Sequence, residues 1–219
     1  MKRNNVDKMF TYLRGYLNGA NMQESMKALT FAKQCHEGQF RKDGETPYIV
    51  HPLSMACYAV ALGIREDSMI STILLHDICE DCNVSLNALP FSYEVKQGVK
   101  YMTVQSYHTD ANKIETKRRY FNELLESREA LICKGIDRYD NLSDMASEFE
   151  SDRIAKNLAE TDVLLLPVLR KGKEKWPDLS NTLFIIRNNI KSLSYSLRYY
   201  HQEEYDKWFK IYSGERNED

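Results

Sequence analysis

The chain has 219 residues, of which 42% are hydrophobic and 28% charged, and its formal net charge is −2. These values predict one folded domain over residues 1–219, with a core at about 25–165 that bears the motifs and a helical extension at about 166–212. The near-neutral charge gives no support to a nucleic-acid partner. The first residues lack an apolar leader and no apolar stretch is long enough to span a bilayer, so we expect a cytoplasmic protein without a membrane partner.

Sparse Gly and Pro and the helical spacing of apolar residues predict an all-α fold. We expect nine helices, at about Met22–His36, His51–Gly63, Ser68–Asp81, Ser85–Leu89, Tyr93–Met102, Lys113–Ser127, Ala130–Met145, Arg153–Arg170 and Leu179–Lys210. Asp67 or Ser68 is the expected N-cap of the third, and Pro52 suits the first turn of the second. The expected loops are Gly38–Tyr48, Gln105–Asp110 and a Lys-rich linker at 170–178, and residues 213–219 are expected to fray.

The five cysteines are scattered along the chain, and we expect free thiols. Cys79 and Cys82 form a single CxxC near an expected helix end. A structural zinc or redox role for this pair stays open beside ordinary helix packing, which a lone CxxC favours.

Four short segments carry a candidate metal site: His51-Pro52, His76-Asp77, Glu80-Asp81 and Asp137 within KGIDRYDN. Two imidazoles and two carboxylates suit a borderline divalent ion such as Mn, Fe or Zn, which can activate water against a phosphate. An acidic pair beside the ligands could orient the water or move protons. The charged groups end buried apolar runs, where they are costly unless they are paired or bound to metal.

Helical spacing adds to this pattern. His76 and Glu80 are four residues apart, as are Asp77 and Asp81, so each pair shares a helix face. Asp137 and Asn141 have the same spacing on another expected helix, with Lys134 one turn earlier. Each residue alone also has a structural reading: His51 as a core histidine, Asp137 as an ion-pair partner of its neighbour, Asn141 as a packing amide.

Three blocks resemble the hydrolase domain of RelA/SpoT-type proteins, within the HD superfamily of metal-dependent phosphohydrolases. They are AKQCHEGQFRKDGETPYIVHPLSMA, ILLHDICEDCNVS and KGIDRYDNLSDMA, and the resemblance covers roughly residues 25–165. It implies an HD-domain helical bundle that binds a small nucleotide and removes the 3′-pyrophosphate of guanosine tetra- or pentaphosphate, usually with Mn²⁺ as cofactor.

The resemblance also implies residue roles. The implied metal ligands are His51, His76, Asp77 and Asp137, and the implied catalytic acids are Glu80 and Asp81. Arg41 and Lys42 would approach the substrate, and Asn141 would line the nucleotide pocket; Tyr48 and Lys134 match without an assigned role. Arg41 and Lys42 also lie in a Gly-flanked loop before His51, where they could meet an anion or be ordinary solvated charges.

The third block departs from the family pattern at Asp140, where a His is frequent, and at Ser143-Asp144, where Arg-Thr is frequent. Extra acids there disfavour a polyanion unless they are paired or turned away. A different nucleotide therefore stays open: an adenosine polyphosphate, NADPH 2′-phosphate or a 5′-nucleotide. So does a catalytically idle nucleotide-binding regulator. The aromatic segment YSLRYYHQEEYDKWFK predicts core packing or a subunit contact, so a homo-oligomer is open too, with base stacking as the alternative.

Overall fold

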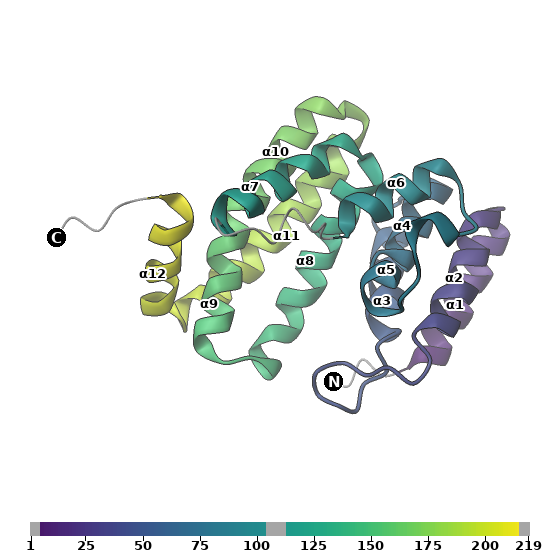
Figure 1. Ribbon diagram of the computed structural model, residues 1–219, viewed down its shortest axis with the longest axis horizontal. Helices are drawn as coiled ribbons and strands as arrows, with labels where there is room; N and C mark the ends of the chain where they lie inside the picture. The colour runs from purple at the N-terminus through teal and green to yellow at the C-terminus, as the bar shows by residue number, and fades with distance from the viewer. Residues whose placement is uncertain (1–4, 104–112, 215–219) are drawn as a thin grey trace. The chain divides into compact units, whose positions relative to one another are not determined.

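A computed structural model describes residues 5–103 and 113–214 of the chain (Figure 1). The all-α prediction is confirmed, because these residues form helices and no strand, apart from an isolated bridge between Phe40 and Pro47. Their contacts divide into two compact units. Described residues 5–103 and 126–136 belong to the first unit, and 113–125 and 137–214 to the second. The expectation of one domain over the whole chain stays a prediction.

The first unit contains α1 (Val6–Gly19), α2 (Gln23–Cys35), α3 (Val50–Ala61), α4 (Asp67–Leu75), α5 (Ile78–Asp81), η1 (Leu86–Ala88), α6 (Tyr93–Met102) and the first part of α8 (Arg128–Glu148). Helix α4 is its central element and contacts α2, α3 and α6. Every residue from Met69 to Leu75 is buried. A helix that is buried on all sides is stable only inside a core. His76 and Asp77 directly follow the end of this buried helix.

Side-chain caps fix the helices around α4. The Asp67 carboxylate accepts hydrogen bonds from the backbone N–H groups of Glu24 (2.9 Å) and Ser25 (2.7 Å), in the first turn of α2. The expected N-cap at Asp67 or Ser68 is wrong, because α4 begins at Asp67 and its N-cap is Glu66. The Asp67 carboxylate caps α2 instead. Glu24 in turn accepts a hydrogen bond from the Ser92 N–H (2.6 Å) before α6.

Gly98 allows α6 to approach the central helix. A Cβ atom at this position would lie 2.5 Å from the Thr72 hydroxyl oxygen and 2.9 Å from Cβ of Glu129. Such distances leave no room for any side chain, so the packing of α6 on α4 depends on glycine at position 98.

The second unit contains α7 (Lys113–Glu123), the remainder of α8, α9 (Ser151–Glu160), the π-helical turn η4 (Thr161–Leu165), α10 (Leu166–Lys175), η5 (Pro177–Leu179), α11 (Ser180–Tyr199) and α12 (Gln202–Ser213). The short η3 (Leu124–Glu126) lies at the division between the units. Helix α9 packs on α12, and α10 packs on α11.

A buried ionic network joins four helices of the second unit. Glu160 is 7% exposed and accepts hydrogen bonds from Arg138 (2.7 Å), from Lys117 and from the Tyr212 hydroxyl (3.2 Å). Burial alone would raise the pKa of Glu160, but the positive charges of Arg138 and Lys117 outweigh it and hold the pKa at about 2. The Glu160 carboxylate is therefore ionised, and it accepts hydrogen bonds from all three of these side chains.

Several predicted elements differ from the observed ones. Helix α1 was not predicted, although its buried Leu13 and Leu17 have helical spacing. The predicted helix at 153–170 continues through 175, so the expected linker at 170–178 is wrong for most of its length. The predicted helix at 179–210 is two helices, α11 and α12, separated at Tyr200 and His201.

Other predictions hold or fall outside the described residues. All five cysteines are free thiols, as expected. The loop at 38–48 is confirmed, and Asp43 orders it by accepting hydrogen bonds from the N–H groups of Glu45 and Thr46. The predicted loop at 105–110 and the tail after Gly214 lie outside the described residues. None of the described helices combines the length and apolar character that a membrane span requires.

Candidate metal centre

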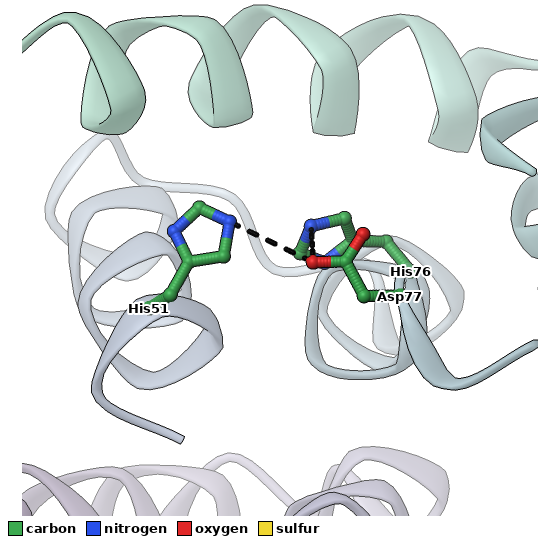
Figure 2. A group of neighbouring side chains, drawn as sticks. All are labelled: His51, His76 and Asp77. Atoms are coloured by element: carbon green, nitrogen blue, oxygen red, sulfur yellow. Dashed lines mark ion pairs between the residues drawn. The ribbon is translucent and has the colours of Figure 1, made fainter. Parts of the chain in front are cut away.

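His51, His76 and Asp77 form a tight cluster in the first unit (Figure 2). Their potential ligand atoms lie within 4.8 Å of one another. Nε2 of His76 is 2.9 Å and Nε2 of His51 is 3.9 Å from the same oxygen, Oδ2 of Asp77. Both imidazoles are 2% exposed, whereas the Asp77 side chain is 20% exposed, so the cluster opens to solvent on its carboxylate side.

Local structure explains how the two histidines meet. His51 lies in the first turn of α3, and His76 and Asp77 occupy the turn that follows α4. The predicted continuous helix from 68 to 81 is wrong, because it is interrupted at these two residues. A regular helix would pair the Ile73 carbonyl with the N–H of Asp77. Here the His76 imidazole bonds to that carbonyl oxygen through Nδ1 (2.9 Å).

This bond also sets the protonation of the ring. A carbonyl oxygen only accepts hydrogen bonds, so Nδ1 of His76 must carry the proton and donate it. In the neutral ring Nε2 then presents its lone pair toward the cluster. Metal-ligating histidines are commonly held in the correct tautomer by such a second bond.

Tyr48 supports the carboxylate of the cluster. Its hydroxyl donates a hydrogen bond to Oδ2 of Asp77 (2.5 Å), and its ring stacks on His36 with centroids 4.8 Å apart. Burial and the negative charges of Asp77 and Asp81 raise the pKa of Tyr48 far above its ordinary value. The hydroxyl therefore stays protonated and can only hold Asp77 as a donor.

The donor set fits a divalent metal. Two neutral imidazole nitrogens and a carboxylate oxygen are the ligands that Mn, Fe and Zn take in proteins. The rings of His51 and His76 are fixed at 65° to each other with centroids 5.2 Å apart, so both nitrogens are held before any ion binds. Removing these polar groups from water costs free energy, and coordination of a cation by the cluster would offset that cost.

The part of the chain that contains the cluster matches a known protein family. The family model described as HD domain matches residues 28–162, which is more than half of the chain and includes the cluster. The chain belongs to the HD domain family. The resemblance noted in the three sequence blocks is thereby confirmed.

Several curated relatives of this HD domain are named as guanosine-3′,5′-bis(diphosphate) 3′-pyrophosphohydrolases, and others, such as that of Myxococcus xanthus, as GTP pyrophosphokinases. The chain is 27% identical over 84% of its length to guanosine-3′,5′-bis(diphosphate) 3′-pyrophosphohydrolase from Aquifex aeolicus. It is 30% identical over 63% of its length to the enzyme of that name from Borreliella burgdorferi. It is 29% identical over 83% to a probable one from Synechocystis. The matched regions are 25%, 21% and 23% of those proteins, so the chain spans about a quarter of their length.

Glu80 and Asp81 lie one turn beyond the cluster. Backbone N–H groups of Glu80 (3.1 Å) and Asp81 (2.8 Å) both bond to the Asp77 carbonyl, and both residues are exposed in α5. Gln39 donates a side-chain hydrogen bond to the Asp81 carbonyl (3.0 Å) and so ties α5 to the loop after α2. The catalytic roles of Glu80 and Asp81 stay predictions.

The remaining predicted site residues have defined local surroundings. Asp137 is 6% exposed on α8, in the second unit, and accepts a hydrogen bond from the Asn141 amide (2.6 Å). Arg41 is half-buried and Lys42 is exposed in the ordered loop at 38–48. The ligand role of Asp137 and the substrate roles of Arg41, Lys42 and Asn141 stay predictions.

Sequence reasoning left the role of Tyr48 open. One signal was available: Tyr48 is three residues before His51, and the N–H of His51 bonds to the Tyr48 carbonyl (3.0 Å) at the start of α3. A residue in this position lies beside His51, the first residue of the cluster. Its contact with Asp77 depends on the tertiary packing of α3 against α4, which no local pattern encodes.

Proposed function

We propose that the chain is a metal-dependent hydrolase that removes the 3′-diphosphate from guanosine 3′,5′-bis(diphosphate) or the corresponding pentaphosphate. The observation that carries this proposal is the cluster of His51, His76 and Asp77, followed one turn later by Glu80 and Asp81. The names of the curated relatives supply the substrate class.

Asp137 is proposed as the fourth ligand and Mn²⁺ as the ion. Asp137 is 6% exposed and is a carboxylate, one of the ligand types that a divalent ion takes in proteins. The amide of Asn141 holds one of its oxygens at 2.6 Å, which is the kind of outer contact that orients a ligating carboxylate. A mixed nitrogen and oxygen donor set accommodates Mn²⁺.

When bound, a divalent ion would supply a water of lowered pKa and positive charge against the phosphate oxygens. Glu80 or Asp81 takes up the proton that the attacking water loses. A new bond forms between the water oxygen and the nearer phosphorus of the 3′-diphosphate, and the bond from that phosphorus to O3′ breaks. O3′ leaves with a proton, which yields the 3′-hydroxyl nucleotide and free diphosphate.

Arg41 and Lys42 are proposed to meet the anionic substrate. Loop 38–48 is held in one conformation by the Asp43 side chain, by the bond from the Arg41 N–H to the Thr46 carbonyl (2.7 Å), and by the left-handed glycines at 38 and 44. A rigid loop loses little entropy on binding, so its cations bind an anion more tightly than flexible ones. Asn141 is proposed to contact the nucleotide through its amide.

A different nucleotide is the second candidate. Asp140 departs from the family pattern within the third sequence block, and it is a buried carboxylate at 6% exposure. An acid at this position favours a substrate with less negative charge than a tetraphosphate, such as NADPH or a 5′-nucleotide.

A nucleotide panel with Mn²⁺ separates the two candidates. The panel holds guanosine 3′,5′-bis(diphosphate), an adenosine polyphosphate, NADPH and a 5′-mononucleotide, and each product is identified. We expect the guanosine substrate to have the highest kcat/KM and to give GDP and diphosphate. A clear preference for another member of the panel would transfer the proposal to that nucleotide.

Variants of the acidic pair test the assigned chemistry. Glu80→Gln and Asp81→Asn remove the proton acceptors without removing a cluster residue. We expect these proteins to bind Mn²⁺ and nucleotide normally and to lose most of kcat, because positioned acid–base groups contribute about 10²–10⁴-fold. Unchanged kcat in both variants would remove the pair from the mechanism.

A further inference from the structure

A cationic cavity lies in the second unit, where α10 packs on α11. Figure 1 shows the two helices. Its volume is about 520 Å³. Four of its lining residues are cationic, Arg170, Lys171, Arg187 and Lys191, and Leu166 and Pro167 add an apolar edge. None of these residues belongs to the metal cluster or to its predicted partners. We call this feature the α10–α11 cavity.

The two helices present their cations on facing surfaces. Only Trp176 and the short η5 connect α10 to α11, so the helices run back along each other. Arg187 and Lys191 are four residues apart on α11 and therefore share a face. Nε of Arg187 donates a hydrogen bond to the Leu166 carbonyl (3.4 Å), which fixes one cation of α11 against the start of α10.

The helix geometry next to the cavity is irregular. The π-helical turn η4 runs directly into α10, and Pro167 follows at the first turn, where it offers no N–H to the preceding turn. π-helical turns inside longer helices are frequent at functional sites. The Leu166 carbonyl at the start of α10 accepts the hydrogen bond from the Arg187 side chain.

The positive charges that line the cavity outnumber the negative ones. Its two acidic residues are Asp162 and Glu174, against four cations. Asp162 already accepts a hydrogen bond from the Tyr205 hydroxyl (2.8 Å) and lies 3.6 Å from Arg198, which is not a lining residue. Burial raises the pKa of Asp162 above its ordinary value, although the Tyr205 bond and the charges of Arg198 and Lys191 act in the opposite direction. Within residues 5–103 and 113–214, Arg170, Lys171 and Lys191 make no ion pair within 4.0 Å.

We propose that the α10–α11 cavity binds a diphosphate group, either as the free anion or as part of a nucleotide. Cations gathered around a hollow repel one another, and a multivalent anion relieves that repulsion while bridging both helices. Guanidinium groups suit phosphate oxygens because they offer paired donors in one plane. The volume is that of a small-molecule site, about 300–1,000 Å³, and not that of an extended groove for an acidic peptide or nucleic acid.

Binding of inorganic diphosphate to the full-length, metal-free protein tests this proposal. Calorimetric titrations in EDTA at low ionic strength compare the wild type with Arg170→Gln/Lys191→Gln, and Lys207→Gln on α12 is the matched control at an exposed lysine. We expect the double variant to bind about tenfold more weakly or worse, since each lost charge-assisted contact weakens binding. The control should bind as the wild type does. Added salt should weaken wild-type binding more than binding by the double variant.

A second arm identifies the source of the diphosphate group. GDP that binds with the same affinity as the free anion indicates recognition of the phosphates alone, and tighter binding of GDP indicates a nucleotide ligand. Equal affinities of wild type and double variant for both probes would overturn the proposal. So would binding of poly-glutamate in the absence of diphosphate binding, which would assign the cavity to an acidic macromolecule.

Folding and catalysis are controlled separately. Thermal melts followed by circular dichroism verify that the double variant is folded, and Lys171→Gln replaces it if it is not. All titrations lack metal, so no turnover occurs. Failure here leaves the proposed hydrolase function untouched, and failure of that function leaves this result standing.

Discussion

The hydroxyl of Tyr48 donates a hydrogen bond of 2.5 Å to Oδ2 of Asp77, the same oxygen that faces both histidines of the cluster. One tyrosine therefore fixes the orientation of the carboxylate around which the proposed metal site is built. The contact joins the loop before α3 to the turn after α4, so it also ties the two ligand-bearing segments together.

Removing that hydroxyl should weaken the site without unfolding the protein. For Tyr48→Phe we expect about 10- to 100-fold lower Mn²⁺ affinity or kcat/KM, the usual cost of losing an outer-sphere partner of a ligand. Metal titration and steady-state kinetics measure both quantities. Tyr93→Phe is the control, because Tyr93 is 72% exposed. Equal losses in the two variants would assign no positioning role to Tyr48.

Function and fold should separate at two neighbouring positions. Asp77→Ala removes a proposed ligand, and we expect it to abolish turnover and weaken metal binding while the helices persist. Leu74 is 1% exposed, and Leu74→Ala should lower the free energy of unfolding by about 2–5 kcal/mol through the cavity it leaves. Activity assays and urea denaturation of both variants check this. Turnover by Asp77→Ala at the wild-type rate would show that the metal assignment is wrong.

The sequence was sufficient for the all-α fold and for His51, His76 and Asp77, because helical periodicity and residue chemistry are both local signals. It was insufficient for features of the fold that depend on tertiary contacts. The interruption after Leu75 depends on the His76 imidazole bonding to the Ile73 carbonyl, and no periodicity encodes this bond. Asp67 resembled a cap of its own helix. Because α2 packs beside α4, its carboxylate instead accepts hydrogen bonds from the first turn of α2.

Two element errors have similar causes. Helix α1 has only a narrow apolar stripe with Leu13 and Leu17 buried, so its polar composition concealed it. The Lys-rich run at 170–175 looked like a linker because of its charge, but α10 continues through it with Lys171 and Lys175 exposed. Charge alone did not distinguish a solvated helix face from a loop.

The hydrogen bonds from the first turn of α2 to the Asp67 carboxylate should contribute measurably to stability. Asp67→Ala leaves the N–H groups of Glu24 and Ser25 without their acceptor, and we expect the free energy of unfolding to fall by about 2 kcal/mol. Urea denaturation provides the measurement. Glu37→Ala, at an exposed acid outside any helix, should change stability far less. A loss no larger than that of Glu37→Ala would mean that water replaces the cap at no cost.

Glu160 should give the protein a distinctive acid sensitivity. The pKa of its carboxyl is about 2 in the folded chain, below the ordinary value of 4.5, so its ionised form stabilises the fold above pH 4.5. That contribution is lost as the pH falls through 4.5 toward 2. Glu160→Gln should cost about 3 kcal/mol at neutral pH, because it leaves Arg138 buried without its anionic partner.

The difference between wild type and Glu160→Gln should therefore shrink as the solution is acidified. Unfolding free energies of the two proteins, measured at several pH values from 7 to 3, test this, with Glu150→Gln at an exposed position as the control. A difference that stays constant over this range would mean that the Glu160 carboxyl does not carry the depressed pKa.

The most direct measurement is product identification after the purified protein is incubated with guanosine 3′,5′-bis(diphosphate) and Mn²⁺. Anion-exchange chromatography separates the tetraphosphate, GDP and diphosphate. We predict equal amounts of GDP and diphosphate, formed by the wild type and not by Asp77→Ala. Intact tetraphosphate in the presence of protein with demonstrably bound Mn²⁺ would contradict the proposed hydrolysis at the His51–His76–Asp77 cluster.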